Sequence, residues 1–136
     1  MIWIAGQNFQ LEPQAQTWFA QSLDAFVAHY DYVALMAMPY MEGADDPQSW
    51  LAGLAAKVGE RGALDKTVFE LQSVDWRHRR LVDADELSAQ MRLIERLGAR
   101  NFGYYPEDFV LGHPEIRKMR AAISLNTDPY RDPYRD

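Results

Sequence analysis

Apolar residues along the chain alternate between short continuous runs and stretches with helical spacing. The continuous runs lie at Ile2–Ala5, Tyr32–Met38, Thr67–Gln72 and Asn101–Tyr105. A short apolar run is typical of a buried strand, and a 3.6-residue period is typical of a helix with one face on the core. The repeated switch between the two predicts four strand–helix units around a parallel sheet.

Local start and stop signals place a helix after each run. Pro13 suits a first helical turn, Asp46-Pro47 is a cap followed by a first-turn proline, and Asp83 has Glu86 at capping-box spacing before Gly98 ends that helix. The stripes expected to face the core are Trp18, Phe19, Leu23, Phe26, Val27 and Tyr30; then Trp50, Leu51, Leu54 and Val58; then Leu87, Met91, Ile94 and Leu97; and last Ile116, Met119 and Ile123. Trp3, on the first strand, is also expected in the core.

Four such units fit either a small open sheet or half of a (β/α)8 barrel. An open doubly wound sheet that binds nucleotides carries a glycine-rich turn after its first strand, and residues 6–9 (GQNF) supply no phosphate loop. The barrel is therefore favoured. We expect residues 1–127 to form the C-terminal half of a (β/α)8 barrel, and residues 128–136, with a duplicated Asp-Pro-Tyr-Arg unit, to be a mobile tail.

Composition narrows the class of protein. The 136 residues suffice for one core, and 48% hydrophobic with 25% charged residues is ordinary globular composition. A formal net charge of −6 argues against a nucleic-acid partner, because the densest basic run is only Arg77–Arg80. The absence of cysteine excludes disulfides and a cysteine nucleophile.

Targeting and metal signals are weak. Residues 1–6 lack a basic region and a long apolar run, and no stretch approaches the roughly 18 apolar residues of a membrane span. Taken alone, the chain is expected in the cytoplasm. His29, His78 and His113 are scattered rather than set at zinc-site spacings, so we expect no metal and no cofactor.

Glu70 is the main candidate for chemistry. Period-2 alternation puts Val68, Glu70 and Gln72 on one face of their strand and Phe69 and Leu71 on the other. If the bulky apolar pair faces the helices, Glu70 faces the barrel interior near its mouth. A carboxylate there is costly unless it is hydrogen-bonded or functional, so a structural pair with an arginine or an amide is the alternative.

Other polar and aromatic residues gather where strands end, which in a barrel is the functional face. Aromatic rings with polar edges suit stacking on a sugar ring, although buried aromatics are more often core. Adjacent tyrosines at 104 and 105 must point opposite ways, and Asp108 is also explained as a turn cap. The candidates are Tyr40, Gln72, Trp76, Tyr104, Tyr105 and Asp108 for binding, and Asp75 beside Glu70 for catalysis.

Three segments at these strand ends carry a family resemblance. Residues 28–42 (AHYDYVALMAMPYME), 66–77 (KTVFELQSVDWR) and 101–109 (NFGYYPEDF) closely resemble the C-terminal domain of PgaB-type poly-β-1,6-N-acetyl-D-glucosamine N-deacetylases. The resemblance covers almost the whole chain. It implies a periplasmic or outer-membrane protein of biofilm exopolysaccharide export, in which a deacetylase domain precedes a glycoside-hydrolase-like (β/α)8 domain.

This chain resembles only the last half of that second domain, which in the family binds the partially deacetylated polymer and in some members cleaves it. Two functions remain open. One is glycosidic hydrolysis with Glu70 and a second carboxylate from Asp75, Asp108 or an absent half-barrel. The other is a glycan-binding or scaffold element that does not cut, and binding is favoured over turnover. Unpaired edge strands of a half-barrel also predict a homodimer.

Overall fold

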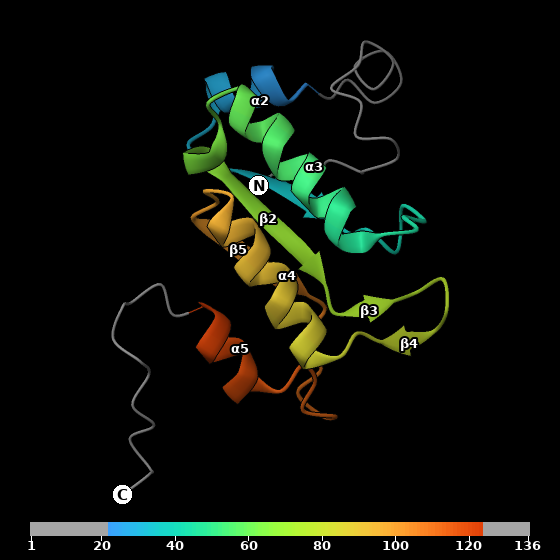
Figure 1. Ribbon diagram of the computed structural model, residues 1–136. Coiled ribbons are helices and arrows are strands. Elements are labelled where there is room, and N and C mark those ends of the chain that lie inside the picture. The colour runs from blue at the N-terminus through green and yellow to red at the C-terminus, as the bar shows by residue number, and fades with distance from the viewer. Residues whose placement is uncertain (1–21, 124–136) are drawn as a thin grey trace, which may run out of the picture.

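The computed structural model describes residues 22–123 of the chain. The first predicted strand at residues 2–5, the start of the first helix with Trp18 and Phe19, and the tail at residues 128–136 lie outside the described residues. Within the described part, strands and helices alternate along the chain, which confirms the α/β class (Figure 1).

Three strands form one parallel sheet in the order β1-β2-β5. They are β1 (Val33–Ala37), β2 (Thr67–Gln72) and β5 (Asn101–Tyr105). The last two have the predicted bounds, and β1 is one residue shorter than predicted at each end. Residues at the same level of the sheet include Leu35, Phe69 and Phe102, and one step further on Met36, Glu70 and Gly103.

The helices begin at the expected caps. In α3 (Pro47–Glu60) the Asp46 side chain accepts the N–H groups of Gln48 and Ser49, each at 3.1 Å. In α4 (Ala84–Arg96) the Asp83 carboxylate accepts the Asp85 N–H at 2.8 Å. Side-chain caps satisfy backbone donors that a helix start leaves free. Helix α2 spans Leu23–His29, a 3-10 turn η2 spans Leu64–Lys66, and α5 spans Ile116–Ile123.

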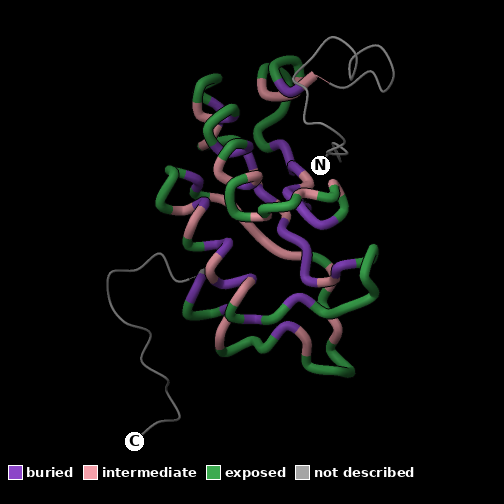
Figure 2. Tube along the Cα trace, turned by 45° about the vertical axis from the view of Figure 1, so that its right-hand side comes forward, coloured by how far each residue is buried: buried purple, intermediate pink, exposed green. Residues whose placement is uncertain are grey.

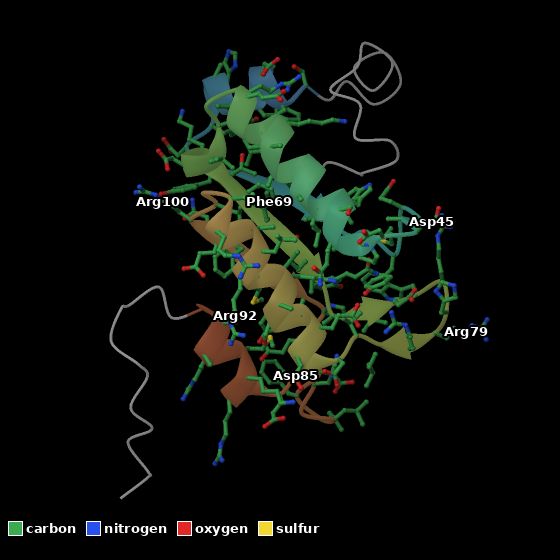
Figure 3. The ribbon with its side chains drawn as sticks, in the orientation of Figure 1. Asp45, Phe69, Arg79, Asp85, Arg92 and Arg100 are labelled. Atoms are coloured by element: carbon green, nitrogen blue, oxygen red, sulfur yellow. The ribbon has the colours of Figure 1, made fainter. Side chains whose placement is uncertain are left out.

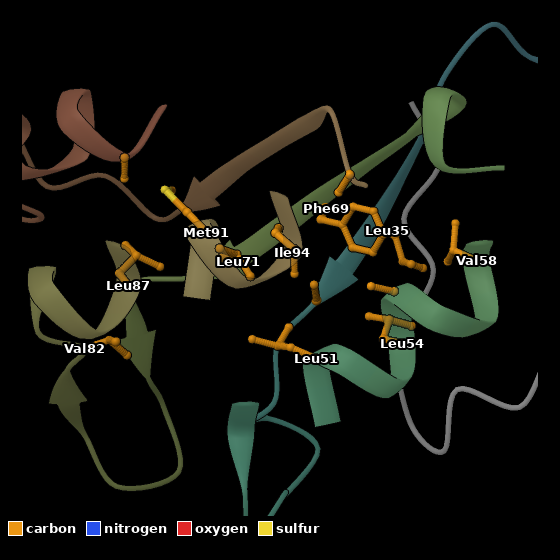
Figure 4. Packing of buried hydrophobic residues seen from close by; sticks show 14 of the residues in the cluster. Leu35, Leu51, Leu54, Val58, Phe69, Leu71, Val82, Leu87, Met91 and Ile94 are labelled. Carbon is orange, nitrogen blue, oxygen red and sulfur yellow. The ribbon is translucent and has the colours of Figure 1, made fainter. Parts of the chain in front are cut away.

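The core lies between the sheet and helices α3 and α4, which cover the same face in Figure 1. Figure 4 shows Phe69 and Leu71 pointing among the side chains of both helices. The packed residues of the two helices include Leu51, Leu54, Val58, Leu87, Met91 and Ile94, all buried as predicted. Trp50 is only partly buried against this core, and Tyr30, Leu97 and Ile116 are exposed, because they lie at or just beyond helix ends.

A short antiparallel hairpin interrupts the strand–helix alternation. After β2 the chain forms β3 (Val74–Asp75) and β4 (Arg80–Leu81), which pair with each other before α4 begins. The hairpin projects from the carboxyl end of β2 (Figure 1), and its turn is exposed (Figure 2). The sequence pattern predicted only a loop here, because two-residue strands are too short to show a period. In the described part of the chain, no helix is long and apolar enough to cross a membrane.

Candidate functional site

Glu70 lies on the sheet face opposite the core. Its sequence neighbours Phe69 and Leu71 are fully buried against the helices, so alternation turns Glu70 to the other face, as predicted. On that face Glu70 lies between Met36 of β1 and Gly103 of β5 in the strand register. All three residues are half-buried. The carboxylate therefore stands in the middle strand of the sheet, flanked by an apolar side chain and by a residue without one.

The environment of Glu70 makes its charge unfavourable. Burial raises the pKa of the Glu70 carboxyl above its ordinary value. Within residues 22–123, Glu70 has no hydrogen bond or ion pair that would offset this desolvation. A structural ion pair, the alternative considered from the sequence, is thus not formed in the described part. A carboxyl with a raised pKa holds its proton to higher pH and is suited to donating it.

Gln72 is buried two residues further along β2. Its Oε1 accepts the backbone N–H of Tyr40 at 2.9 Å and of Met41 at 3.2 Å, and its Nε2 donates to the carbonyl of Val74 at 2.6 Å. The side chain is fully enclosed. It therefore joins the loop after β1 to the end of β2, and its polar atoms are engaged by backbone groups of these two segments.

Asp75 is also buried, on β3 of the hairpin. Its Oδ1 accepts the His78 backbone N–H at 3.2 Å, and its Oδ2 lies 2.8 Å from His78 Nδ1 and 3.2 Å from Arg80 Nε. Burial alone would raise the pKa of the Asp75 carboxyl, but the hydrogen bonds from His78 and the charges of His78 and Arg80 together lower it. Asp75 is thus an ionised anchor of the hairpin with its oxygens already engaged.

Arg80 links this anchor to two other elements. Its guanidinium lies over the ring of Tyr40, 4.8 Å from the centroid, and its Nη1 is 3.6 Å from Glu86 of α4. Tyr40 is nearly buried under this contact. A cation over an aromatic face is stabilising, so Arg80 fastens the loop after β1 and the start of α4 to the hairpin.

Trp76 and Tyr105 are the exposed aromatics of this region. Their side chains are 42% and 48% exposed, and the ring centroids lie 6.4 Å apart with planes inclined by 38°. Tyr105 shares a face of the sheet with Gln72 and Glu70, because Gln72 and Tyr105 are register partners. The two rings therefore form an open aromatic pair at the carboxyl edge of the face that carries Glu70.

Tyr104 points the other way, as expected for adjacent strand residues. It packs against the core side of the sheet and its hydroxyl hydrogen-bonds Glu107. Burial, followed by the charge of Glu107 and this hydrogen bond, raises the pKa of the Tyr104 hydroxyl. Of the two candidate tyrosines, Tyr105 is exposed and Tyr104 is half-buried.

Asp108 caps a turn, which is the alternative to ligand binding that the sequence allows for it. Its Oδ1 accepts the backbone N–H groups of Val110 at 2.9 Å and Leu111 at 3.0 Å. Two backbone hydrogen bonds join Asp108 to His113 across this turn, at 2.8 and 2.9 Å. Its carboxylate is thereby directed into its own loop.

Ser73, Arg80 and His113 were not recognised from the sequence as part of this region. The Ser73 N–H donates to Tyr105 O at 2.9 Å, the Ser73 carbonyl accepts from Val82 N at 2.9 Å, and His113 Nε2 lies 2.9 Å from the same carbonyl. These contacts cross segments up to 40 residues apart in sequence. No local sequence pattern predicts these contacts. The sequence showed only that Arg80 belongs to the basic run Arg77–Arg80.

The surface around these residues is polar and carries both signs of charge. Figure 3 shows the loop with Asp45 and the hairpin turn with Arg79 projecting on the same side of the molecule. No cluster of three or more histidine, aspartate or glutamate side chains suited to a metal ion occurs among residues 22–123. The groups available at this edge are therefore carboxylates, an arginine and aromatic rings, which suit a polyhydroxylated or cationic ligand.

Comparison with known proteins connects this region to carbohydrate chemistry. A family model described as hypothetical glycosyl hydrolase family 13 matches residues 7–105. The poly-β-1,6-N-acetyl-D-glucosamine N-deacetylases of Escherichia coli K12 and O157:H7 are each 34% identical to the chain over 128 residues, which cover 90% of it. The solved PgaB (BpsB) glycoside hydrolase domain from Bordetella bronchiseptica is 46% identical, with a TM-score of 0.80 over 86% of this chain.

These relatives are much longer. The aligned part is 19% of each Escherichia coli protein and 33% of the Bordetella bronchiseptica structure. The chain therefore spans about a fifth of the curated relatives it matches, and it matches a third of the Bordetella bronchiseptica glycoside hydrolase domain.

Proposed function

Because the chain belongs to the hypothetical glycosyl hydrolase family 13, we propose that it binds partially de-N-acetylated poly-β-1,6-N-acetyl-D-glucosamine as a glycoside-hydrolase-like element of biofilm exopolysaccharide processing. The polymer is taken from the names of the two Escherichia coli relatives, which are poly-β-1,6-N-acetyl-D-glucosamine N-deacetylases. The observation that carries the proposal is Glu70, a half-buried carboxylate with a raised pKa and no partner among residues 22–123.

The proposal includes the C-terminal half of a (β/α)8 barrel. Strands β1, β2 and β5 are parallel and follow one another in the sheet in chain order. A barrel keeps that order, whereas an open doubly wound sheet reverses it at a switch point where ligands bind. In a barrel, the Glu70 face is the interior face and the Trp76–Tyr105 pair lies at the carboxyl rim, where barrel enzymes place their sites.

Each candidate residue then has a role. Trp76 and Tyr105 stack against sugar rings, and Tyr40 is held in place by the Arg80 guanidinium over its ring. Glu70 contacts the sugar or the glycosidic oxygen, and its raised pKa suits a proton donor. Gln72 and Asp108 shape the rim, since their polar atoms are bound to backbone.

Hydrolysis needs a second carboxylate on the other side of the scissile bond. Asp75 and Asp108 both hold local hydrogen bonds. This supports a second carboxylate contributed by another part of a longer protein, and hence binding rather than cleavage by this chain. A non-catalytic scaffold half-barrel is the second function that this observation favours.

The remaining proposals concern location and assembly. We propose a location in the periplasm or at the outer membrane, which the family resemblance supports. Within the described residues β1 and β5 are the edges of the sheet. This supports a homodimer, because unpaired parallel strands are templates for pairing with another chain.

The test is to incubate the full chain with de-N-acetylated polymer and to measure both polymer length and co-elution. We expect intact polymer that co-elutes with the protein, and reduced co-elution for Glu70→Gln. Glu60→Gln, the same change at an exposed position near the end of α3, is the control and should behave as wild type. Shortened polymer would establish hydrolysis, and Glu70→Gln should then slow it by about two or more orders of magnitude. Absence of both binding and cleavage would contradict the proposal.

A further inference from the structure

The backbone conformation at Gly103 does not require a glycine. It lies in the middle of β5, and its φ is outside the left-handed region that favours glycine. Among residues 22–123, no atom lies within 4 Å of a Cβ built at this position, so crowding by the described residues does not exclude a side chain either. Glycine inside a strand weakens the strand and often marks a place where a ligand approaches the backbone closely.

Gly103 lies beside Glu70 in the sheet, so its lack of a side chain affects the surroundings of the carboxylate. Glu70 and Gly103 are register partners, and neighbouring strands lie about 4.8 Å apart. Both residues face away from the core, so the missing side chain leaves the space next to the carboxylate free of atoms from the described residues. On the same face of β5, Asn101 is tied by its Nδ2 to the Asp65 carbonyl at 2.9 Å, while Tyr105 leans on Trp76. Neither side chain has an atom within 4 Å of a Cβ built at Gly103.

We infer that Gly103 is a specificity-determining residue of the glycan site, keeping open the space in which one sugar ring lies flat on β5 against Glu70. This inference rests on the proposed function and refines it. A pyranose ring on the bare strand brings its substituents beside the Glu70 carboxylate, where an ammonium group or a glycosidic oxygen meets it. A side chain at 103 would lift the ring by roughly one carbon–carbon bond, about 1.5 Å, and separate the two.

The test compares Gly103→Ala and Gly103→Val with wild type in the full chain, using β-1,6-linked glucosamine oligosaccharides as the probe. Because a displacement of about 1 Å is enough for large losses at a reacting group, we expect at least a tenfold weaker affinity for Gly103→Ala and a further loss for Gly103→Val. The melting temperature of Gly103→Ala should be unchanged or higher, because alanine is the better strand residue.

Gly53→Ala is the matched control. Gly53 also has no atom within 4 Å of a built Cβ, but it is exposed on α3, on the other side of the sheet. It should bind the oligosaccharides as wild type does. Wild-type affinity in Gly103→Ala would overturn the inference while leaving the proposed function standing. Wild-type protein that binds none of the oligosaccharides would contradict the proposed function itself, and the role of Gly103 with it.

Discussion

Arg80 and Asp75 are joined across the β3–β4 hairpin, with Arg80 Nε 3.2 Å from Asp75 Oδ2. The Asp75 side chain is only 1% exposed, whereas Arg80 is 44% exposed. His78, between them in sequence, binds the same carboxylate through its ring and its backbone. The exposed turn that carries Trp76 is thereby tied to one buried anion, so the geometry of the aromatic pair depends on Asp75.

Replacing that anion should destabilise the protein. Asp75→Asn keeps the shape but removes the charge that Arg80 and His78 face in a buried site, and hydrogen bonds to charged groups are worth about 1.5 to 3 kcal/mol. We expect the free energy of unfolding to fall by about that amount in denaturant titrations. The control is Asp65→Asn, whose pair with Arg100 at 3.5 Å is exposed on both sides and should change stability by less than about 1 kcal/mol. Equal effects of the two substitutions would contradict the anchoring role.

The same pair predicts the direction of a pH effect. Because the pKa of Asp75 is lowered in the folded protein, its contribution is present above the unfolded value of about 3.9 and is lost as pH falls through the folded value. The stability gap between wild type and Asp75→Asn should therefore close in acid. A gap that stays constant down to strongly acidic pH would show that charge is not its cause.

The contribution of Glu70 to stability should depend on pH in the opposite direction. Its raised pKa means that folding favours the protonated form, so its contribution is present below the unfolded value of about 4.3 and is lost as pH rises through the folded value. Relative to wild type, Glu70→Gln should gain stability between acidic and neutral pH, since glutamine has no charge to desolvate. Thermal unfolding at several pH values measures this. A sharp loss of stability at neutral pH would instead indicate a structural ion pair, whose disruption costs about 3 to 5 kcal/mol.

The exposed aromatic pair makes a prediction about ligand choice. De-N-acetylated oligomers carry ammonium groups, so they should bind better than fully acetylated ones, and their affinity should fall with ionic strength.

Trp76→Ala should weaken binding of both oligomers by about tenfold, since loss of a cation–π or stacking contact is worth about 1 to 2 kcal/mol.

Tyr32→Ala is the control for that substitution. Tyr32 is also an exposed aromatic, but it precedes β1 at the opposite end of the sheet. Its removal should leave binding unchanged. Equal binding of both oligomers without salt dependence would show that charge attraction to the ammonium groups does not contribute to binding.

Assembly is open to direct measurement. Within the described residues, β1 and β5 are the edges of the three-stranded sheet. If two copies close a barrel, light scattering should report twice the 15.7 kDa of one chain across micromolar concentrations. A stable monomer over that range would rule the homodimer out.

The sequence by itself determined the alternation of the three longer strands with helices, the bounds of β2 and β5, the starts of α3 and α4, and the face of Glu70. These follow from local rules: the apolar runs at 67–72 and 101–105, the caps at Asp46 and Asp83, and two-residue alternation along a strand. Each rule operates within a few residues of the chain, so it can be read without knowing what lies across the fold.

Only the tertiary structure decided which candidate side chains are exposed and which are buried with their polar atoms already bound. In the sequence, Gln72 and Asp75 cannot be told apart from other polar residues near a strand end, yet both are buried. Gln72 binds the backbone of the loop after β1, and Asp75 binds Arg80 on the opposite strand of the hairpin. That hairpin is too short to show a period in the sequence. The space at Gly103 is also a property of the register between β2 and β5. Pairing between strands is set by packing of the whole sheet on its helices, which no local stretch of sequence contains.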